Sequence, residues 1–268
     1  MSTARPPILL VGAGRMGSAL IKGWSKAGLG PIVAVEPQPS AALRKLTGLK
    51  FVAAIDAIPP QRWRACVVAL KPQILKTEAA RFKPFAAAGV PMISIAAGTG
   101  VRFLNKAWGA RARIVRAMPN TPGSIGRGIT ALYAAPKATA KDKKLAETLL
   151  AALGQTVWVK NEALIDAATA VSGSGPAYVF ALAEALAAAG EAAGLPRAAA
   201  ERLARATVSG AGALLDADKR AAAELRRDVT SPGGTTEAAL KILLAEDGLF
   251  ALMRRAVAAA KARAKELG

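Results

Sequence analysis

The hydrophobic pattern of this chain changes near residue 160, and this change limits its possible folds more than any other feature. Before residue 160, short apolar runs rich in β-branched residues alternate with segments of helical periodicity. The runs lie at residues 7–12, 32–35, 66–71, 90–98, 113–118, 129–135 and 156–159. This alternation is typical of a mainly parallel sheet covered by helices.

After residue 160 the sequence shows no convincing strand. Long Ala/Leu segments are interrupted at "SGSGP", "GLPR", "SGAG" and "TSPGG", and Pro176 and Pro196 lie where first-turn prolines begin helices. We therefore predict an α/β domain over residues 1–160 and an all-helical domain over 161–268. Helices with broad alanine faces bury little area alone, so we expect the helical domain to form a homodimer.

A glycine-rich turn follows the first apolar run. In "ILLVGAGRMGSALIKGW", Gly12, Gly14 and Gly17 lie between a predicted strand and a predicted helix. The first glycine permits a tight turn, the second permits close approach of a pyrophosphate, and the third permits close packing of helix and strand. The turn predicts a Rossmann dinucleotide site, although a glycine-rich turn without a ligand remains an alternative.

The choice between NADH and NADPH depends on the end of the second predicted strand. Glu36 ends this strand 19 residues after Gly17, where an acidic side chain binds ribose hydroxyls and repels a 2′-phosphate. This position favours NADH. Ser40, Arg44 and Lys45 follow and offer a phosphate pocket, and Glu36 is equally explained as a solvated residue at a strand end. Both cofactors therefore stay open.

Three more loops are expected at the carboxyl ends of the predicted strands. Parallel strands bring such loops to one edge of the sheet, where ligands bind. Lys71 directs a cation there, and small residues allow a nicotinamide to lie against the backbone. The loops are Lys71-Pro72, Ala96-Ala97-Gly98 and Met118-Pro119-Asn120.

The rarest residue types exclude several classes of chemistry. The chain has no histidine and one cysteine, Cys66. This composition excludes Ser-His-Asp and Cys-His nucleophiles, histidine-ligated metals, internal disulfides and multi-cysteine metal sites, and we predict no metal. The N-terminal apolar stretch is short and lacks a cleavage site, and no long apolar span appears, so we predict a cytoplasmic protein without membrane segments.

The chain is strongly basic, with 37 Lys and Arg residues against 18 Asp and Glu, a formal net charge of +19. Nucleic acid, an anionic membrane surface or anionic small ligands would all suit this charge. The cations are scattered, aromatic residues make up 4% of the chain, and no nucleic-acid module is recognisable. We therefore interpret the charge as a solvated basic surface and predict no nucleic-acid partner.

Two glycine-rich loops interrupt the helical half. In "TSPGGTT", Gly233 and Gly234 precede a helix and expose backbone donors suited to an anion, and two threonines follow them. The alternative is a plain helix connection with Ser231 or a threonine as N-cap. "VSGSGPAYVF" is similar, because residues 172–175 interrupt the helical pattern before the next helix and so also predict exposed backbone donors. The alternative is a simple helix break.

Taken in order and spacing, six motifs resemble those of the Δ1-pyrroline-5-carboxylate reductases. They are "VGAGRMGSAL", "VALKPQ", "SIAAG", "RAMPNTP", "AVSGSGPAY" and "TSPGGTT", and they extend from about residue 7 to the C-terminus. The resemblance implies a Rossmann domain, an interlocking helical dimerisation domain, and reduction of a cyclic imine by NADPH or NADH to give proline. It also implies that active sites lie between the two domains.

The resemblance also implies site residues. Cofactor contacts fall on Gly12, Ala13, Gly14, Arg15, Met16, Gly17, Ala69, Leu70, Lys71, Pro72, Ala96, Ala97 and Gly98, to which Glu36 and Asn120 are added from their strand ends. Substrate contacts fall on Glu162, Ser174, Gly175, Gly233, Gly234, Thr235 and Thr236. Thr236 is expected to orient the imine nitrogen, and "VEPQPS" departs from the family where polar or basic residues often meet an NADP phosphate.

Imine reduction suits a site without histidine, because an imine can arrive already protonated and the cofactor carries the hydride chemistry. A β-hydroxyacid dehydrogenase is the nearest rival, yet it relies on a lysine early in the helix after its second glycine motif, and residues 173–218 contain none. Reduction of other cyclic imines stays open. A nucleic-acid-binding protein on a Rossmann scaffold would instead bind in a steeply salt-dependent way and ignore the cofactor.

Overall fold

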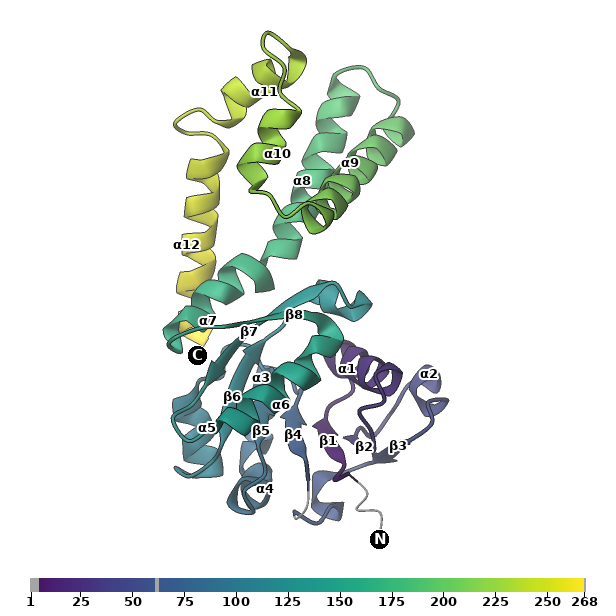
Figure 1. The fold of residues 1–268 in the computed structure, drawn as a ribbon, viewed down its shortest axis with the longest axis vertical. Coiled ribbons are helices and arrows are strands. Elements are labelled where there is room, and N and C mark those ends of the chain that lie inside the picture. The colour runs from purple at the N-terminus through teal and green to yellow at the C-terminus, as the bar shows by residue number, and fades with distance from the viewer. Residues whose placement is uncertain (1–4, 61–62, 268) are drawn as a thin grey trace. The chain divides into compact units, whose positions relative to one another are not determined.

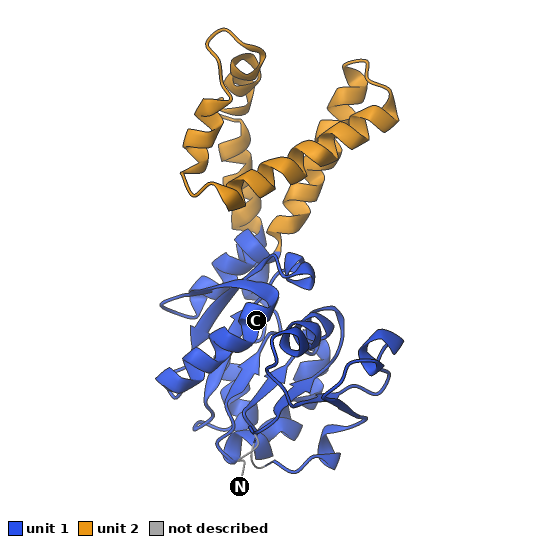
Figure 2. Cartoon of the chain, turned by 45° about the vertical axis from the view of Figure 1, so that its right-hand side comes forward, with its two compact units in different colours: residues 1–173, 260–268 blue, residues 174–259 orange. Residues whose placement is uncertain are grey.

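The computed structural model describes residues 5–60 and 63–267. The chain forms two compact units, shown in different colours in Figure 2. Unit 1 comprises Met1–Gly173 and Ala260–Gly268, and unit 2 comprises Ser174–Ala259. The domain limits 1–160 and 161–268 stay a prediction. Each unit is described on its own below.

Unit 1 contains one eight-stranded sheet in the order β3-β2-β1-β4-β5-β6-β7-β8 (Figure 1). The strands are β1 (Ile8–Val11), β2 (Ile32–Val35), β3 (Leu49–Val52), β4 (Ala65–Val68), β5 (Met92–Ser94), β6 (Ile114–Met118), β7 (Gly128–Ala134) and β8 (Gly154–Trp158). β6 and β7 are antiparallel and the other neighbours are parallel. The predicted mainly parallel α/β architecture is confirmed, and the order of the first six strands is that of a Rossmann fold.

Strand β3 was absent from the predicted set. Its four residues, "LKFV", include the exposed Lys50, so they do not stand out as an apolar run. The strand lies at the edge of the sheet and pairs on one side, with β2. Pairing to β2 rather than local hydrophobicity therefore defines it.

Alternating residues of the strands build two cores, one on each face of the sheet. Leu9 and Val11 of β1 belong to the core packed against α3 (Pro72–Glu78), α4 (Lys83–Ala87) and α5 (Val101–Trp108). Ile8 and Leu10 belong to the core packed against α1 (Arg15–Lys26), α2 (Ala41–Arg44) and α6 (Ala140–Leu150). The period of two in β1 thus places helices on both faces, as the sequence pattern predicted.

Unit 2 is all helical, which confirms the predicted class of the second half. Its helices are α8 (Gly175–Ala192), α9 (Arg197–Ala217), α10 (Ala222–Asp228), α11 (Thr235–Leu243) and the first part of α12 (Leu249–Leu267). α8 and α9 pack along each other (Figure 1). Within residues 174–259, all of which are described, Ala200 and Ala204 alone are buried.

Candidate active site

The carboxyl ends of five neighbouring strands form one edge of the unit 1 sheet. Val11 pairs with Val35 of β2 and with Val68 of β4, and Val68 pairs with Ser94 of β5. Ser94 in turn pairs with Arg116 near the end of β6. The loops after these strands carry the predicted cofactor residues, so the structure brings all of them to this carboxyl edge.

The glycine turn after β1 has the geometry that the motif predicts. Gly12 has a φ of +93°, and a Cβ there would lie 2.9 Å from the Ala69 carbonyl oxygen. A Cβ on Gly17 would lie 2.0 Å from the Gly12 carbonyl oxygen, so the third glycine permits the packing of α1 on the turn. A Cβ on Gly14 would meet none of the described atoms within 4 Å. Gly14, which precedes α1, therefore leaves space for a pyrophosphate at the helix N-terminus.

Glu36 is held against the glycine turn. Its Oε2 accepts a hydrogen bond from the Ala13 N–H at 2.9 Å, and its Oε1 accepts one from the Gln38 N–H at 3.2 Å. The side chain is therefore fixed between the turn and the end of β2 rather than extended into solvent. This arrangement places a negative charge beside the predicted adenosine end of the cofactor site.

The segment between β5 and α5 is anchored at both ends. The Ile95 N–H donates to the Val68 carbonyl oxygen at 3.0 Å. At the other end, the Val101 N–H donates to Glu162 Oε1 at 2.6 Å. Between them lie the predicted contacts Ala96, Ala97 and Gly98. Glu162, expected from the resemblance to touch substrate, thus has a structural contact within unit 1, and its substrate contact stays a prediction.

A further chain segment packs on this loop. Gly98 has a φ of +60°, and a Cβ there would lie 3.1 Å from the Leu267 Cβ. The Lys76 Nζ donates to the Leu267 carbonyl oxygen at 3.3 Å. The last turn of α12 therefore belongs to the surroundings of the carboxyl edge, and no local signal in the sequence indicated this.

Arg116 is a residue that the sequence reasoning missed. It lies in β6 and is 5% exposed. Its Nη1 lies 3.0 Å from Glu162 Oε1, and its Nη2 lies 3.8 Å from Asp166 Oδ1. A charged residue inside the apolar run "RIVRAM" was the available signal, because such a residue requires a partner when it is buried.

The loops after β4 and β6 place the remaining predicted contacts of unit 1. Lys71 precedes α3 and is exposed, with Pro72 in the first turn of that helix. The Asn120 Oδ1 accepts a hydrogen bond from the Ile129 N–H at 3.0 Å. Asn120 thereby joins the turn after β6 to the beginning of β7.

The "SGSGP" segment differs from the expected open helix break. Helix α7 (Ala163–Ala168) continues into a π-helical turn over Thr169–Gly173, and the Ser172 Oγ donates to the Ala168 carbonyl oxygen at 2.9 Å. A Cβ on Gly173 would lie 2.8 Å from the Met118 Cε, so this glycine packs at the end of β6. Ser174 and Gly175 follow directly, and α8 begins at Gly175 with a first-turn proline, as predicted.

The "SPGGTT" loop forms a helix N-terminus in unit 2. Gly233 has a φ of +70°, and Gly234 is the N-cap residue of α11, with Thr235 and Thr236 in the first turn. Ser231 and the threonines do not cap the helix through their side chains. The Gly233 N–H instead donates to Glu237 Oε2 at 2.9 Å. The structure brings these four predicted residues into one turn, with Thr236 half-buried.

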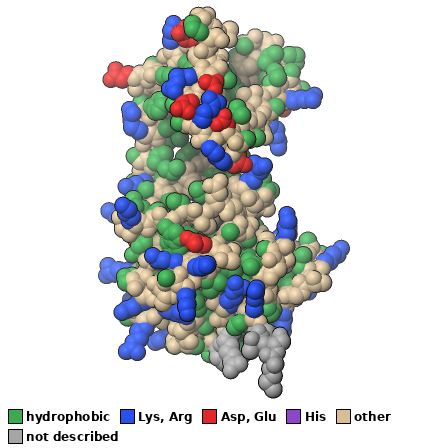
Figure 3. Space-filling model, viewed as in Figure 1, with side chains coloured by type: hydrophobic (Ala, Val, Ile, Leu, Met, Phe, Trp, Pro, Cys, Tyr) green, Lys and Arg blue, Asp and Glu red, His purple; other side chains and the backbone are tan. Residues whose placement is uncertain are grey.

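The charged side chains of the described residues bear on two alternative functions, a metal site and a nucleic-acid surface. They contain no group of three or more His, Cys, Asp or Glu side chains that would hold a metal ion. Lys and Arg side chains are spread over many elements on the face shown in Figure 3 rather than gathered in one patch. No helix within residues 5–60 and 63–267 has both the length and the apolar character needed to cross a membrane.

Comparison with known proteins identifies relatives over the whole chain. The family model for pyrroline-5-carboxylate reductase dimerisation matches residues 162–267. The pyrroline-5-carboxylate reductase of Pseudomonas aeruginosa is 39% identical over 272 residues, which cover 100% of this chain and 98% of that protein.

Solved structures of pyrroline-5-carboxylate reductases also match nearly the whole chain. A pyrroline-5-carboxylate reductase from Coxiella burnetii has a TM-score of 0.91 at 34% identity, covering 99% of both chains. The pyrroline carboxylate reductase of Plasmodium falciparum, determined with NADP bound, has a TM-score of 0.81 at 28% identity, covering 98% of both chains. Because the Pseudomonas aeruginosa reductase is 39% identical and matches this chain from end to end, the chain belongs to the pyrroline-5-carboxylate reductase family.

Proposed function

We propose that this chain reduces the cyclic imine of 1-pyrroline-5-carboxylate to L-proline with NADPH or NADH. The observation that carries the proposal is the carboxyl edge of the unit 1 sheet, which carries both a glycine turn with space at Gly14 and, two strands away, the loop of small residues at 96–98. Membership of the reductase family supplies the reaction.

The residues of the carboxyl edge fit a dinucleotide. Within Gly12–Gly17, the backbone N–H groups at the N-terminus of α1 hold the pyrophosphate, because those of Gly12 and Ala13 are already bonded to the Val35 carbonyl oxygen and to Glu36. Glu36 lies where the adenosine ribose binds, and Ala69–Pro72 and Asn120 line the neighbouring loops. When bound, the reduced nicotinamide supplies the hydride. The small side chains at 96–98 let the nicotinamide lie close to the backbone.

The glycine-bearing turns around "SGSGP" and "SPGGTT" hold the substrate. A carboxylate on a small ring needs donors, and the first turn of α11 supplies backbone N–H groups and a favourable helix dipole. The Gly233 N–H is bonded to Glu237, so a substrate carboxylate replaces Glu237 as acceptor or uses the amides of Thr235 and Thr236. Ser174 and Gly175 complete the contacts to the ring.

Thr236 orients the imine nitrogen through its hydroxyl, and it is the residue to which we assign a catalytic role. A threonine hydroxyl both donates and accepts a hydrogen bond, so it holds a protonated or a neutral ring nitrogen. It is too weak an acid to drive the reaction by proton transfer. Its contribution is therefore the alignment of the C=N bond with the cofactor.

Steady-state rates with 1-pyrroline-5-carboxylate and each cofactor in turn test the function. We expect substrate-dependent loss of reduced-nicotinamide absorbance, and the ratio of the two rates gives the cofactor preference. Thr236→Val removes the hydroxyl at constant volume, and we expect kcat/KM to fall by about 100-fold with an unchanged Kd for the cofactor. Thr236→Ser keeps the hydroxyl and retains most activity. Equal activity of the valine variant and the wild type would remove Thr236 from the mechanism.

The working form is a homo-oligomer built through unit 2, consistent with the match of residues 162–267 to a dimerisation family. The cell compartment we propose is the cytoplasm. In support, the apolar residues Ile8–Val11 form the buried strand β1 inside the sheet. Cell fractionation followed by the reductase assay tests the location.

A further inference from the structure

Arg116 carries a charge into the interior of unit 1. Its side chain is 6% exposed and lies on β6 between Ser94 of β5 and Tyr133 of β7. A buried guanidinium is unfavourable unless carboxylates and hydrogen-bond acceptors compensate for the lost water. Glu162 at 3.0 Å and Asp166 at 3.8 Å provide the two carboxylates, both from the beginning of α7.

Glu162 extends this ion pair to α5. The same Oε1 that accepts from Arg116 also accepts the Val101 N–H, the first amide of the helix. The N-cap residue Gly100 has no side chain with which to cap α5, and a Cβ there would lie 3.4 Å from Glu162 Oε1. A carboxylate from 61 residues away therefore serves as the cap, and the glycine leaves room for it.

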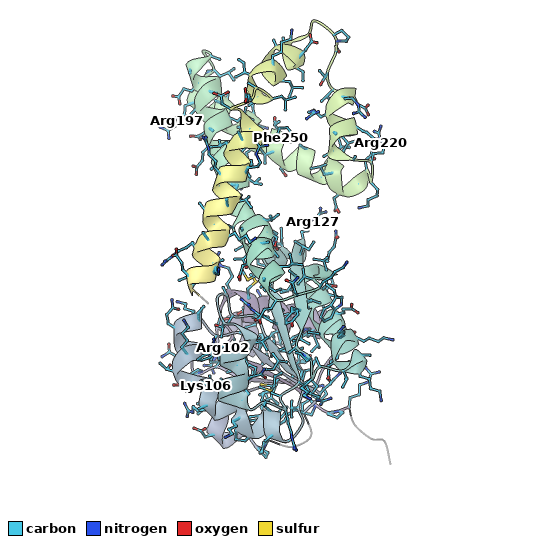
Figure 4. The ribbon with its side chains drawn as sticks, turned by 90° about the vertical axis from the view of Figure 1, so that its left-hand side faces the viewer. Arg102, Lys106, Arg127, Arg197, Arg220 and Phe250 are labelled. Carbon is cyan, nitrogen blue, oxygen red and sulfur yellow. The ribbon has the colours of Figure 1, made fainter. Side chains whose placement is uncertain are left out.

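The pair therefore fixes the end of the segment that we expect to face the nicotinamide. The first residues of this segment are held by β4 and by the Ser94 side chain, since the Ala96 N–H donates to Ser94 Oγ at 3.4 Å. The last residues are held by Glu162. α5 itself, which carries Arg102 and Lys106 in Figure 4, begins at this bond.

We propose that Arg116 and Glu162 are positioning residues for the nicotinamide half of the cofactor. Arg116 holds the Glu162 carboxylate, which caps α5 and sets the backbone of residues 96–100. This role rests on the proposed function, because it presumes that a reduced nicotinamide lies on that segment. It requires neither side chain to touch the cofactor.

Unit 1 contains a matched control at the other end of β6. Arg113, just before the strand, has its Nη1 3.1 Å from Asp142 Oδ1. Asp142 also caps α6, accepting the Thr139 N–H at 2.8 Å. Each carboxylate thus pairs with an arginine of the β6 segment and accepts a backbone N–H at a helix N-terminus, but Asp142 lies away from the carboxyl edge. Asp142→Ala is the control for Glu162→Ala.

The first experiment uses no cofactor. Amide hydrogen exchange of the full-length protein is compared between wild type, Glu162→Ala, Glu162→Gln and Asp142→Ala. We expect the Val101 amide and residues 96–100 to exchange faster in Glu162→Ala, with a smaller change in Glu162→Gln, which keeps an oxygen acceptor. Asp142→Ala should accelerate exchange at the beginning of α6 and leave residues 96–101 unchanged. Unchanged exchange at Val101 in Glu162→Ala would overturn the proposal.

The second experiment separates the two halves of the cofactor. NADH binding is followed by nicotinamide fluorescence, and ADP-ribose, which lacks the nicotinamide, is followed by calorimetry. We expect Glu162→Ala to raise the Kd for NADH by about tenfold and to leave the Kd for ADP-ribose unchanged. Arg116→Lys keeps the charge but loses the planar fork, and we expect an intermediate rise. Asp142→Ala should alter neither Kd.

Three results would contradict the positioning role. An equal rise of both Kd values in Glu162→Ala would indicate a general loss of structure, and an unchanged Kd for NADH would show no coupling to the nicotinamide. A rise confined to the KM for 1-pyrroline-5-carboxylate would instead make Glu162 a substrate contact. If Glu162→Ala does not fold, Glu162→Gln decides by the same criteria. A wild type that binds NADH without reducing the imine overturns the proposed reaction, and the Kd comparison still decides the positioning role.

Discussion

The two compact units of this chain bury their apolar side chains to different extents. In unit 1, Leu10, Trp24 and Leu149 are 0% exposed, and each face of the sheet has its own core. In unit 2, many apolar side chains are exposed, and on α8 the exposed fractions are 42–63% for Val179, Phe180, Leu182 and Leu186.

Unit 2 is the less complete of the two. Phe250 on α12, labelled in Figure 4, is 59% exposed, and α8 is apolar apart from Tyr178, Glu184 and Glu191. An apolar helix surface of this kind belongs in an interface, whereas unit 1 satisfies its own core. We infer from this difference that unit 1 supplies the proposed cofactor site within one chain, while the exposed apolar surface of unit 2 is the surface that a second copy covers.

The largest effect is expected from a charge on the exposed apolar surface of unit 2. Phe180→Asp places a carboxylate where a partner helix would pack, which costs far more than a lost contact. We expect dissociation in sedimentation, loss of reductase activity by about 100-fold or more, and retention of cofactor binding by unit 1. Arg197→Ala, which removes an exposed ion pair to Glu201, is the control and should change little. A dimeric Phe180→Asp variant would contradict the distinction between the units.

Leucine-to-alanine changes in the two units sharpen the same comparison. Leu149→Ala opens a cavity in the unit 1 core and should reduce the free energy of unfolding by about 3–5 kcal/mol. That loss should not depend on protein concentration. Leu182→Ala, 53% exposed in the single chain, should lower Tm most at low protein concentration, because it weakens association. Calorimetric scans over a range of concentrations distinguish the two behaviours.

Two glycines of the same turn separate folding from binding within unit 1. Gly17→Ala puts a Cβ 2.0 Å from the Gly12 carbonyl oxygen, so we expect a loss of about 1–3 kcal/mol in stability together with weaker cofactor binding. Gly14→Ala meets none of the described atoms within 4 Å, so stability should hold while cofactor affinity falls by about tenfold. Thermal melts and nicotinamide fluorescence measure the two effects. Normal cofactor affinity in Gly14→Ala would place the pyrophosphate elsewhere.

The burial of Cys66 in the core of unit 1 predicts that the stability of the protein depends on pH in the alkaline range. Burial raises the pKa of this thiol to about 12, from a value near 9 in the unfolded chain. The neutral thiol is thus favoured by folding, and this contribution is complete below pH 9 and is lost as the pH rises from about 9 to 12. The alkaline loss of stability should be smaller in Cys66→Ala than in the wild type. Iodoacetamide should leave Cys66 unmodified in the folded protein and label a Leu182→Cys variant only in the monomer.

Local signals made most of unit 1 predictable. Each β-branched run and the glycine motif is a short local pattern that can be recognised in the sequence. Parallel pairing of the strands then places Gly12, Glu36, Lys71 and Ala96 at the carboxyl edge of the sheet. β3 escaped prediction because an edge strand of four residues depends on its neighbour β2 for definition.

Other features depend on residues far apart in the sequence. Arg116 and Glu162 are 46 residues apart. No local sequence pattern indicates that an arginine in a strand pairs with the carboxylate that caps a helix. The π turn at Thr169–Gly173 is equally hidden, because serines and glycines are compatible with an open break and with a widened helix. The Gly233 N–H donates to Glu237, and Gly233 has a positive φ. The sequence alone does not specify that backbone conformation.

The measurement that tests the central claim most directly follows activity and cofactor binding on the same samples. Wild type and Phe180→Asp are compared for their oligomeric state by sedimentation, for their Kd for NADPH and NADH, and for their rate with 1-pyrroline-5-carboxylate. The account predicts a dimer that binds and reduces, and a monomer that binds the cofactor with nearly unchanged Kd but does not turn over. A monomer with full activity per chain would contradict it.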